Sequence, residues 1–128
     1  MNNFFTVLKY NLTADERAGR YLRDRGWKVE FVNAAVSGEN GLDKIVKEDV
    51  LKNFNQMLIK SDTEGYERDV LSTGLHLIKE YKPSLAIAAY HRGDDLLVIP
   101  KLIWDANPDY KIYLKPETID GTFNLFAF

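Results

Sequence analysis

Acidic side chains gather directly after a short apolar segment near the middle of the chain. Residues 57–61 have the length and composition of a buried strand, and Asp62, Glu64 and Glu67 follow it. In an open α/β sheet, ligands bind at the carboxyl ends of the strands. These three carboxylates therefore mark the place where we expect chemistry or cofactor binding.

A second polar group follows the next apolar segment of strand length. Residues 85–90 form a continuous apolar run, as in a parallel strand covered on both faces, and His91 and Arg92 come directly after it. If the two segments are neighbouring parallel strands, Asp62 and His91 meet at one rim of the sheet. A general base takes a proton from the reacting group, and imidazole changes charge near neutral pH. His91 is therefore our candidate base, although capping of a strand end explains it equally well.

The other polar residues near this rim allow more than one interpretation. Glu64 and Glu67 fall in the first turn of a predicted helix, where the helix dipole favours carboxylates. Capping is the simpler role for Glu67, with substrate contact as the alternative, whereas Glu64 is balanced between capping and cofactor contact. Tyr90 and Arg92 are candidate substrate contacts. A divalent metal held by Asp62, Glu64 and His91 is an alternative, but a single histidine with mixed carboxylates is a weak metal signature, so we predict no metal site.

Hydrophobic spacing predicts the elements that must position these residues. The predicted strands are 4–9, 28–36, 57–61 and 85–90, followed by an antiparallel pair at 110–115 and 122–128 that turns at Asp120-Gly121. The predicted helices are 13–25 with a capping box at Thr13 and Glu16 and a stop at Gly26, one containing Ile45 to Phe54, and one over 65–81. Pro100 lies too deep for a first-turn proline, so we expect a short turn capped by Asp94 or Asp95 and a fresh start near Pro100. The segment from residue 57 to 90 is thus a βαβ unit.

Composition limits the class of protein. The 128 residues are 45% hydrophobic and 28% charged, which suits one globular domain over 1–128 with its own core. The formal net charge of −2 gives no field that would attract nucleic acid, so nucleic acid is not an expected partner. The chain has no cysteine for disulfides or thiolate zinc sites, and its N-terminal apolar run is too short to span a membrane. The simplest location is cytoplasmic.

Several short motifs follow one another in a recognisable order. The longest is Ile59-Lys60-Ser61-Asp62-Thr63-Glu64-Gly65-Tyr66-Glu67. It is preceded by Val32-Asn33-Ala34-Ala35-Val36-Ser37 and followed by Lys82-Pro83-Ser84-Leu85-Ala86-Ile87, Tyr90-His91, Asp95-Leu96 and Ile99-Pro100. Together with the aromatic terminal strands, these resemble the I-K-x-D-x-E-G-x-E, V-N-A-A-V-S and K-P-x-L-A-I motifs of FkbM-type methyltransferases. The resemblance extends from about residue 29 to the end.

This resemblance implies a fold, a reaction and a cofactor. The implied fold is a three-layer, Rossmann-like α/β sheet, mostly parallel, with a C-terminal antiparallel hairpin. The implied reaction transfers a methyl group from S-adenosylmethionine to a hydroxyl of a sugar or natural product. Asp62 and Glu64 are the cofactor contacts it suggests, with His91 and Asp62 as the catalytic pair.

The start of the chain departs from the family pattern. No Gly-rich turn for the methionine part of the cofactor precedes residue 29, and Lys9-Tyr10-Asn11 stands where a ribose-binding carboxylate is expected. We therefore expect the N-terminal strand, which is central in the family's sheet, and its Gly-rich loop to be missing. We also expect this chain alone to bind S-adenosylmethionine poorly.

Three explanations for the departure remain open. The chain is a piece of a longer enzyme, it obtains the strand from a partner chain or a second copy, or it has become a non-catalytic α/β domain. The first two predict a partial O-methyltransferase acting on a small-molecule or glycan acceptor. The third predicts an interaction or assembly module, whose exposed strand edge pairs with another chain. A membrane partner is not expected.

Overall fold

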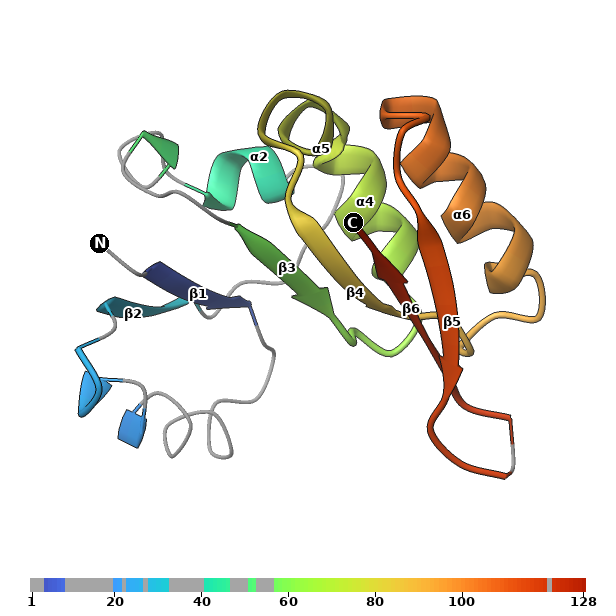
Figure 1. The fold of residues 1–128 in the computed structure, drawn as a ribbon, viewed down its shortest axis with the longest axis horizontal. Helices are drawn as coiled ribbons and strands as arrows, with labels where there is room; N and C mark the ends of the chain where they lie inside the picture. Colours follow the sequence, from blue (N-terminus) through green and yellow to red (C-terminus); the bar gives the residue numbers. More distant parts are fainter. Residues whose placement is uncertain are drawn as a thin grey trace.

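The computed structural model describes residues 4–8, 20–21, 23–26, 28–32, 41–46, 51–52, 57–119 and 121–128. The strands are β1 (Phe4–Leu8), β2 (Lys28–Val32), β3 (Leu58–Ser61), β4 (Ser84–Ala88), β5 (Ile112–Pro116) and β6 (Phe123–Ala127) (Figure 1). The helices are α2 (Leu42–Ile45), α4 (Glu67–Thr73), α5 (Leu75–Tyr81) and α6 (Asp95–Ala106). The predictions for residues 9–19, 22, 33–40, 47–50, 53–54 and 120 lie outside the described residues.

The larger sheet has four strands in the order β3-β4-β6-β5. β3 and β4 are parallel, with Leu58 opposite Ser84 and Ser61 opposite Ile87, so the predicted βαβ unit is confirmed. β6 runs antiparallel to both β4 and β5, which confirms the predicted terminal hairpin. The domain is therefore an α/β fold with a mixed sheet.

The smaller sheet is the parallel pair of β1 and β2. Within the described part of the chain, no ladder hydrogen bonds join it to the four-stranded sheet. Residues 20, 21 and 23 before β2 are helical, and the chain turns at Gly26 with a φ of +81°, as predicted for a helix stop. The expectation that a central strand is missing stays a prediction.

Helices α4, α5 and α6 lie together on one face of the four-stranded sheet, as Figure 1 shows. The core forms between them and the sheet. Its fully buried members are Leu71, Leu77, Ile78, Leu85, Ile87, Ile99, Ile103, Leu125 and Ala127. The second helical layer of a three-layer fold is not found among the described residues. None of the described helices is long and apolar enough to cross a membrane.

The predicted helix over 65–81 is two helices, so that prediction is wrong at its centre. Helix α4 ends at Thr73 and α5 begins at Leu75, with Gly74 between them. A Cβ atom on Gly74 would lie 2.7 Å from Leu42 Cδ2, and Leu42 is buried. Thr73 Oγ1 donates a hydrogen bond to the Asp69 carbonyl at 2.7 Å and accepts one from the Leu42 amide at 3.1 Å. The break therefore lets α2 approach, which helical spacing alone does not reveal.

The expected interruption near Pro100 is also wrong, because α6 is continuous from Asp95 to Ala106. Proline removes the hydrogen bond to the carbonyl four residues earlier, and an interior proline costs about 3 kcal/mol. That carbonyl belongs to Leu96, which is exposed, so water can serve it. Ile99 and Ile103 are completely buried on either side of the proline, and each contributes about 1.5–3 kcal/mol by burial. Packing thus outweighs the local preference.

Candidate functional site

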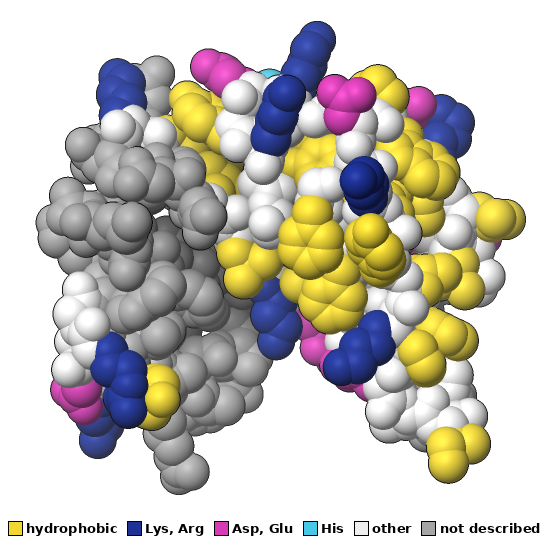
Figure 2. Space-filling model, viewed as in Figure 1, with side chains coloured by type: hydrophobic (Ala, Val, Ile, Leu, Met, Phe, Trp, Pro, Cys, Tyr) yellow, Lys and Arg dark blue, Asp and Glu magenta, His cyan; other side chains and the backbone are white. Residues whose placement is uncertain are grey.

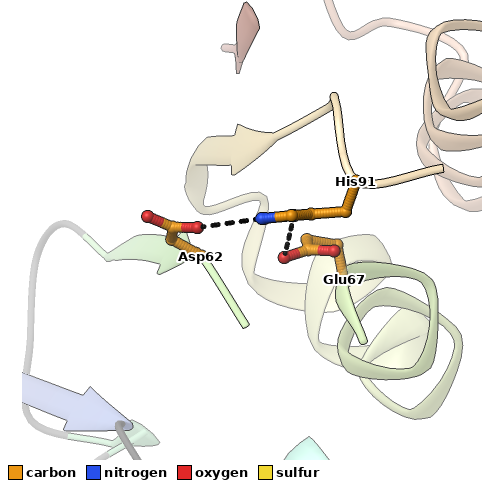
Figure 3. A group of neighbouring side chains, drawn as sticks. All are labelled: Asp62, Glu67 and His91. Carbon is orange, nitrogen blue, oxygen red and sulfur yellow. Dashed lines mark ion pairs between the residues drawn. The ribbon is translucent and has the colours of Figure 1, made fainter. Parts of the chain in front are cut away.

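The carboxyl ends of β3 and β4 lie at the same rim of the sheet, because the two strands are parallel. Asp62 follows β3 directly and His91 lies three residues beyond β4. His91 Nε2 is 3.7 Å from Asp62 Oδ1 (Figure 3). The structure therefore brings together the two residues that the sequence suggests as a catalytic pair.

Glu67 is the buried carboxylate of this rim, with 1% of its surface exposed. Its Oε1 accepts the Thr63 amide at 2.7 Å and the Thr63 hydroxyl at 3.2 Å, and its Oε2 accepts the Gly65 amide at 3.1 Å. Gly65 has a φ of +103°, which lets the chain turn tightly from β3 into α4. The Glu67 oxygens thus bind the turn that precedes α4 rather than an amide of the helix. Capping of α4 and substrate contact by Glu67 both stay predictions.

His91 lies between Glu67 and the two exposed carboxylates. Its Nδ1 is buried and 3.1 Å from Glu67 Oε1, but it makes no hydrogen bond to any of the described residues. Its Nε2 is 3.4 Å from Glu64 Oε2 as well as close to Asp62. Glu67 therefore acts on the ring through its charge, and Nε2 is the nitrogen that faces the open carboxylates.

Glu64 and Tyr90 are the other neighbours of the His91 ring. Glu64 has a φ of +55°, a left-handed conformation that costs a non-glycine residue about 1–3 kcal/mol, and its side chain is 88% exposed. The Tyr90 ring lies 4.3 Å from the His91 ring and its hydroxyl donates to Asp62 Oδ1 at 3.5 Å. Burial, followed by the charges of Asp62 and Glu64, raises the pKa of the Tyr90 phenol. Tyr90 therefore remains a protonated donor at neutral pH.

An ion-pair network fastens the loop that carries His91 onto α4. Arg68 pairs with the buried Asp95 at 2.7 Å and with Asp94, and Asp95 Oδ2 accepts the Arg92 amide at 2.8 Å. The hydrogen bond from Arg68 lowers the pKa of Asp94. Neither of the two predicted caps acts as a helix cap here: the Asp94 side chain makes no cap hydrogen bond, and Asp95 closes the preceding turn instead.

Arg92 extends from the same loop toward α4. Its guanidinium lies 3.9 Å from Asp69 Oδ2, and both side chains are about half exposed. It therefore stands beside the rim without contacting His91 in any described interaction. Substrate contact by Arg92 stays a prediction.

Sequence reasoning did not single out Arg68 or Thr63. A cation in the first turn of a helix is disfavoured by the helix dipole, so an arginine there signals an acidic partner from elsewhere. That signal was available for Arg68, although it does not name Asp95 as the partner. Thr63 carried no such signal, because its role depends on the conformation of the turn.

Asp62, Glu67 and His91 offer ligand atoms that lie within 4.8 Å of one another, so they form a candidate metal group. The geometry favours another use. Glu67 faces Nδ1 and Asp62 faces Nε2, so the two carboxylates do not converge on one nitrogen. Glu67 Oε1 also already accepts two hydrogen bonds from Thr63. The arrangement is better suited to orienting an imidazole than to binding a cation.

Comparison with known proteins supports the fold. No family model matches the chain, and no curated protein matches it. The chain is similar to the crystal structure of methyltransferase FkbM from Methylobacillus flagellatus KT, with a TM-score of 0.76 and 25% sequence identity. The match covers 99% of this chain but 36% of that one. This chain therefore has a methyltransferase-like α/β fold.

Proposed function

We propose that this chain is a FkbM-like O-methyltransferase domain, or part of one, that methylates a hydroxyl group of a sugar or natural product. The observation that carries the proposal is the meeting of Asp62 and His91 at the rim of two parallel strands. The likeness to a methyltransferase of known structure supports the same reaction class. The acceptor would bind above this rim.

The distance between the two side chains suits a hydroxyl group. An oxygen about 2.8 Å from each of two polar atoms fits between atoms 3.7 Å apart. The acceptor hydroxyl would donate its proton to His91 Nε2 while Asp62 holds the acceptor in place. The imidazolium formed would lie 3.1 Å from Glu67 and 3.4 Å from Glu64, and both charges stabilise it. His91 is then the base, and Glu67 acts through it.

The exposed carboxylates of the rim fit a cationic cofactor. Asp62 is half exposed and Glu64 is almost fully exposed, so both are free to contact the positive groups of S-adenosylmethionine. When bound, the cofactor would supply the methyl group, in line with the acceptor oxygen. Lys9-Tyr10-Asn11, which stand where the family resemblance expects a ribose-binding carboxylate, lie outside the described part of the chain.

Tyr90 and Arg92 are proposed to contact the acceptor. The Tyr90 phenol already donates to Asp62, so it can share a sugar hydroxyl with that carboxylate. Arg92 is half exposed and offers several donors close to the same rim. A polyhydroxylated acceptor would suit these donors and acceptors.

Transfer of labelled methyl groups tests the proposal. The chain would be incubated with methyl-labelled S-adenosylmethionine at millimolar concentration and a panel of sugars and hydroxylated natural products. We expect slow incorporation that His91→Ala reduces by about 100-fold or more, the usual contribution of a general base. His76→Ala is the matched control, since His76 is exposed on α5 and should leave the rate unchanged. Full activity of His91→Ala would contradict the proposal. Absence of incorporation would contradict methyl transfer by this chain alone.

A non-catalytic interaction module is the second candidate. It is favoured by the lack of ladder hydrogen bonds between β1 and β3, which lie in contact, because in the described residues this leaves strand edges available for pairing. Sedimentation at increasing concentration distinguishes this candidate, because a partner-seeking edge predicts dimers or larger species. A constant monomeric mass would count against pairing between copies.

A further inference from the structure

The side chains on the face of the four-stranded sheet opposite the helices differ from those on the helix-covered face. Successive residues of a strand point to opposite faces. Ile59, Leu85 and Ala127 form a cross-strand row that is buried against the helices. The next row, Lys60, Ala86, Phe126 and Tyr113, therefore belongs to the opposite face.

This opposite face is largely apolar and exposed. Leu58 is 53% exposed, Tyr113 56% and Phe128 61%, and Phe126 is half-buried beside Tyr113. The rings of Tyr113 and Phe128 are 6.3 Å apart. Figure 2 shows hydrophobic side chains gathered in the middle of this view, over β6 and β5. We call Leu58, Tyr113, Phe126 and Phe128 the open face.

Lysines surround the open face. Lys60 stands in the row of Tyr113 and Phe126, and Lys111 and Lys115 have the same strand parity as Tyr113 on the edge strand. All three are exposed, and no ion pair to them is found among the described residues. Dark blue side chains flank the hydrophobic patch in Figure 2. An occupant of this face would meet apolar surface at the centre and positive charge around it.

We propose that the open face is a docking site for an acidic amphipathic helix of another polypeptide. Sheets with parallel strands in α/β proteins are covered by helices on both faces, and the apolar run of β4 has the composition of a strand covered on both sides. A helix with an apolar stripe would cover Tyr113 and Phe128, and acidic side chains beside that stripe would pair with Lys60 and Lys111.

Charge distinguishes this occupant from two others. A second copy of the face would bring Lys60, Lys111 and Lys115 against the same lysines, which costs free energy. A nucleic acid would meet the exposed carboxylates of Asp62 and Glu64 near the end of β3, on a chain with a net charge of −2. The acidic helix satisfies both the apolar centre and the lysines.

Peptide titration tests the proposal. The probe is a fluorescent 18-residue helical peptide with a leucine stripe flanked by glutamates, and the matched peptide carries lysines instead. We expect the acidic peptide to bind, and Tyr113→Ser with Phe128→Ser to weaken it at least about tenfold. Lys60→Glu with Lys111→Glu should weaken it about tenfold at low salt and less at high salt. Leu97→Ser, on the 76% exposed position of α6, is the control and should change nothing.

Other outcomes would overturn the proposal. Equal binding of the lysine peptide would remove the role of charge, and unchanged binding by the Tyr113→Ser, Phe128→Ser variant would remove the open face. A dimer that these substitutions dissociate would assign the face to a second copy. Competition by a single-stranded oligonucleotide would assign it to nucleic acid. Circular dichroism of each variant checks the fold, which should be retained because the substituted side chains are exposed.

Discussion

Replacement of Glu67 by glutamine is the most direct test of how the rim is built. The substitution keeps the size of the side chain but removes its charge and turns one oxygen into a donor. Three donors now point at the carboxylate, the Thr63 amide and hydroxyl at Oε1 and the Gly65 amide at Oε2. An amide side chain can accept at only one of its two ends, so at least one backbone N–H loses its acceptor.

The magnitude follows from burial. Hydrogen bonds to a charged group contribute about 1.5–3 kcal/mol each, and a buried donor left without an acceptor costs about 1–3 kcal/mol. Glu67 is 1% exposed, so water cannot easily replace the lost acceptor. We therefore expect Glu67→Gln to lower the free energy of unfolding by about 2–4 kcal/mol.

Urea unfolding followed by circular dichroism measures this difference. Glu64→Gln is the matched control, because Glu64 stands between the two donor residues, Thr63 and Gly65, but its side chain is 88% exposed. Exposed substitutions usually stay within about 0.5 kcal/mol. If Glu67→Gln unfolds at the same urea concentration as the wild type, the buried carboxylate does not hold the turn. The inference that Glu67 positions the rim around His91 would then have no support.

Three further predictions concern stability. Burial raises the pKa of Tyr110 from 10.0 to about 12, so the Tyr110 contribution to wild-type stability should be full below pH 10 and fall between pH 10 and about 12. Tyr110→Phe loses the 2.5 Å hydrogen bond to the Pro83 carbonyl, at a cost of about 1 kcal/mol. In denaturant unfolding across this pH range, the variant should lack the decline in stability that the wild type shows. Gly74→Ala should lower the free energy of unfolding by about 1–3 kcal/mol, although alanine has the better helix propensity, because the added Cβ would clash with Leu42. Adding Leu42→Ala to this variant should relieve part of the strain. A single Gly74→Ala variant that is more stable than the wild type would refute the close approach of Gly74 and Leu42. Pro100→Ala should raise the melting temperature, because α6 already runs through this position and regains a hydrogen bond of the backbone; a lower value would show that the proline is needed.

Periodicity and turn chemistry predicted the local elements well. The apolar runs that became β3 and β4, their parallel pairing and the terminal hairpin all follow from strand-length apolar segments separated by a helical pattern. The meeting of Asp62 and His91 follows in turn, since parallel neighbours end at one rim. These features depend on short stretches of sequence or on chain direction alone.

The errors lie where distant segments decide. Gly74 ends α4 because Leu42 of α2 packs there, and α6 continues through Pro100 because Ile99 and Ile103 are buried on either side. Neither contact can be inferred from the local pattern. The second helical layer stays a prediction, because covering a sheet face depends on which segment, or which partner, reaches it.

The residues from Asp62 to Glu67 are held together by the hydrogen bonds of Glu67. Reasoning from the sequence, which treated each residue separately, therefore assigned them separate roles. Glu67 accepts hydrogen bonds from the amides of Thr63 and Gly65, the two residues that flank Glu64, and Thr63 follows Asp62 directly. The buried carboxylate therefore fixes the backbone from which both exposed carboxylates project, and it also lies beside His91 Nδ1. A substitution of Glu67 should accordingly disturb the acceptor contact and the base together, whereas Glu64→Gln should affect only the charge near Nε2. Methyl-transfer rates of the two variants, measured at temperatures where both are folded, separate these effects, and equal losses would show that the turn does not position His91.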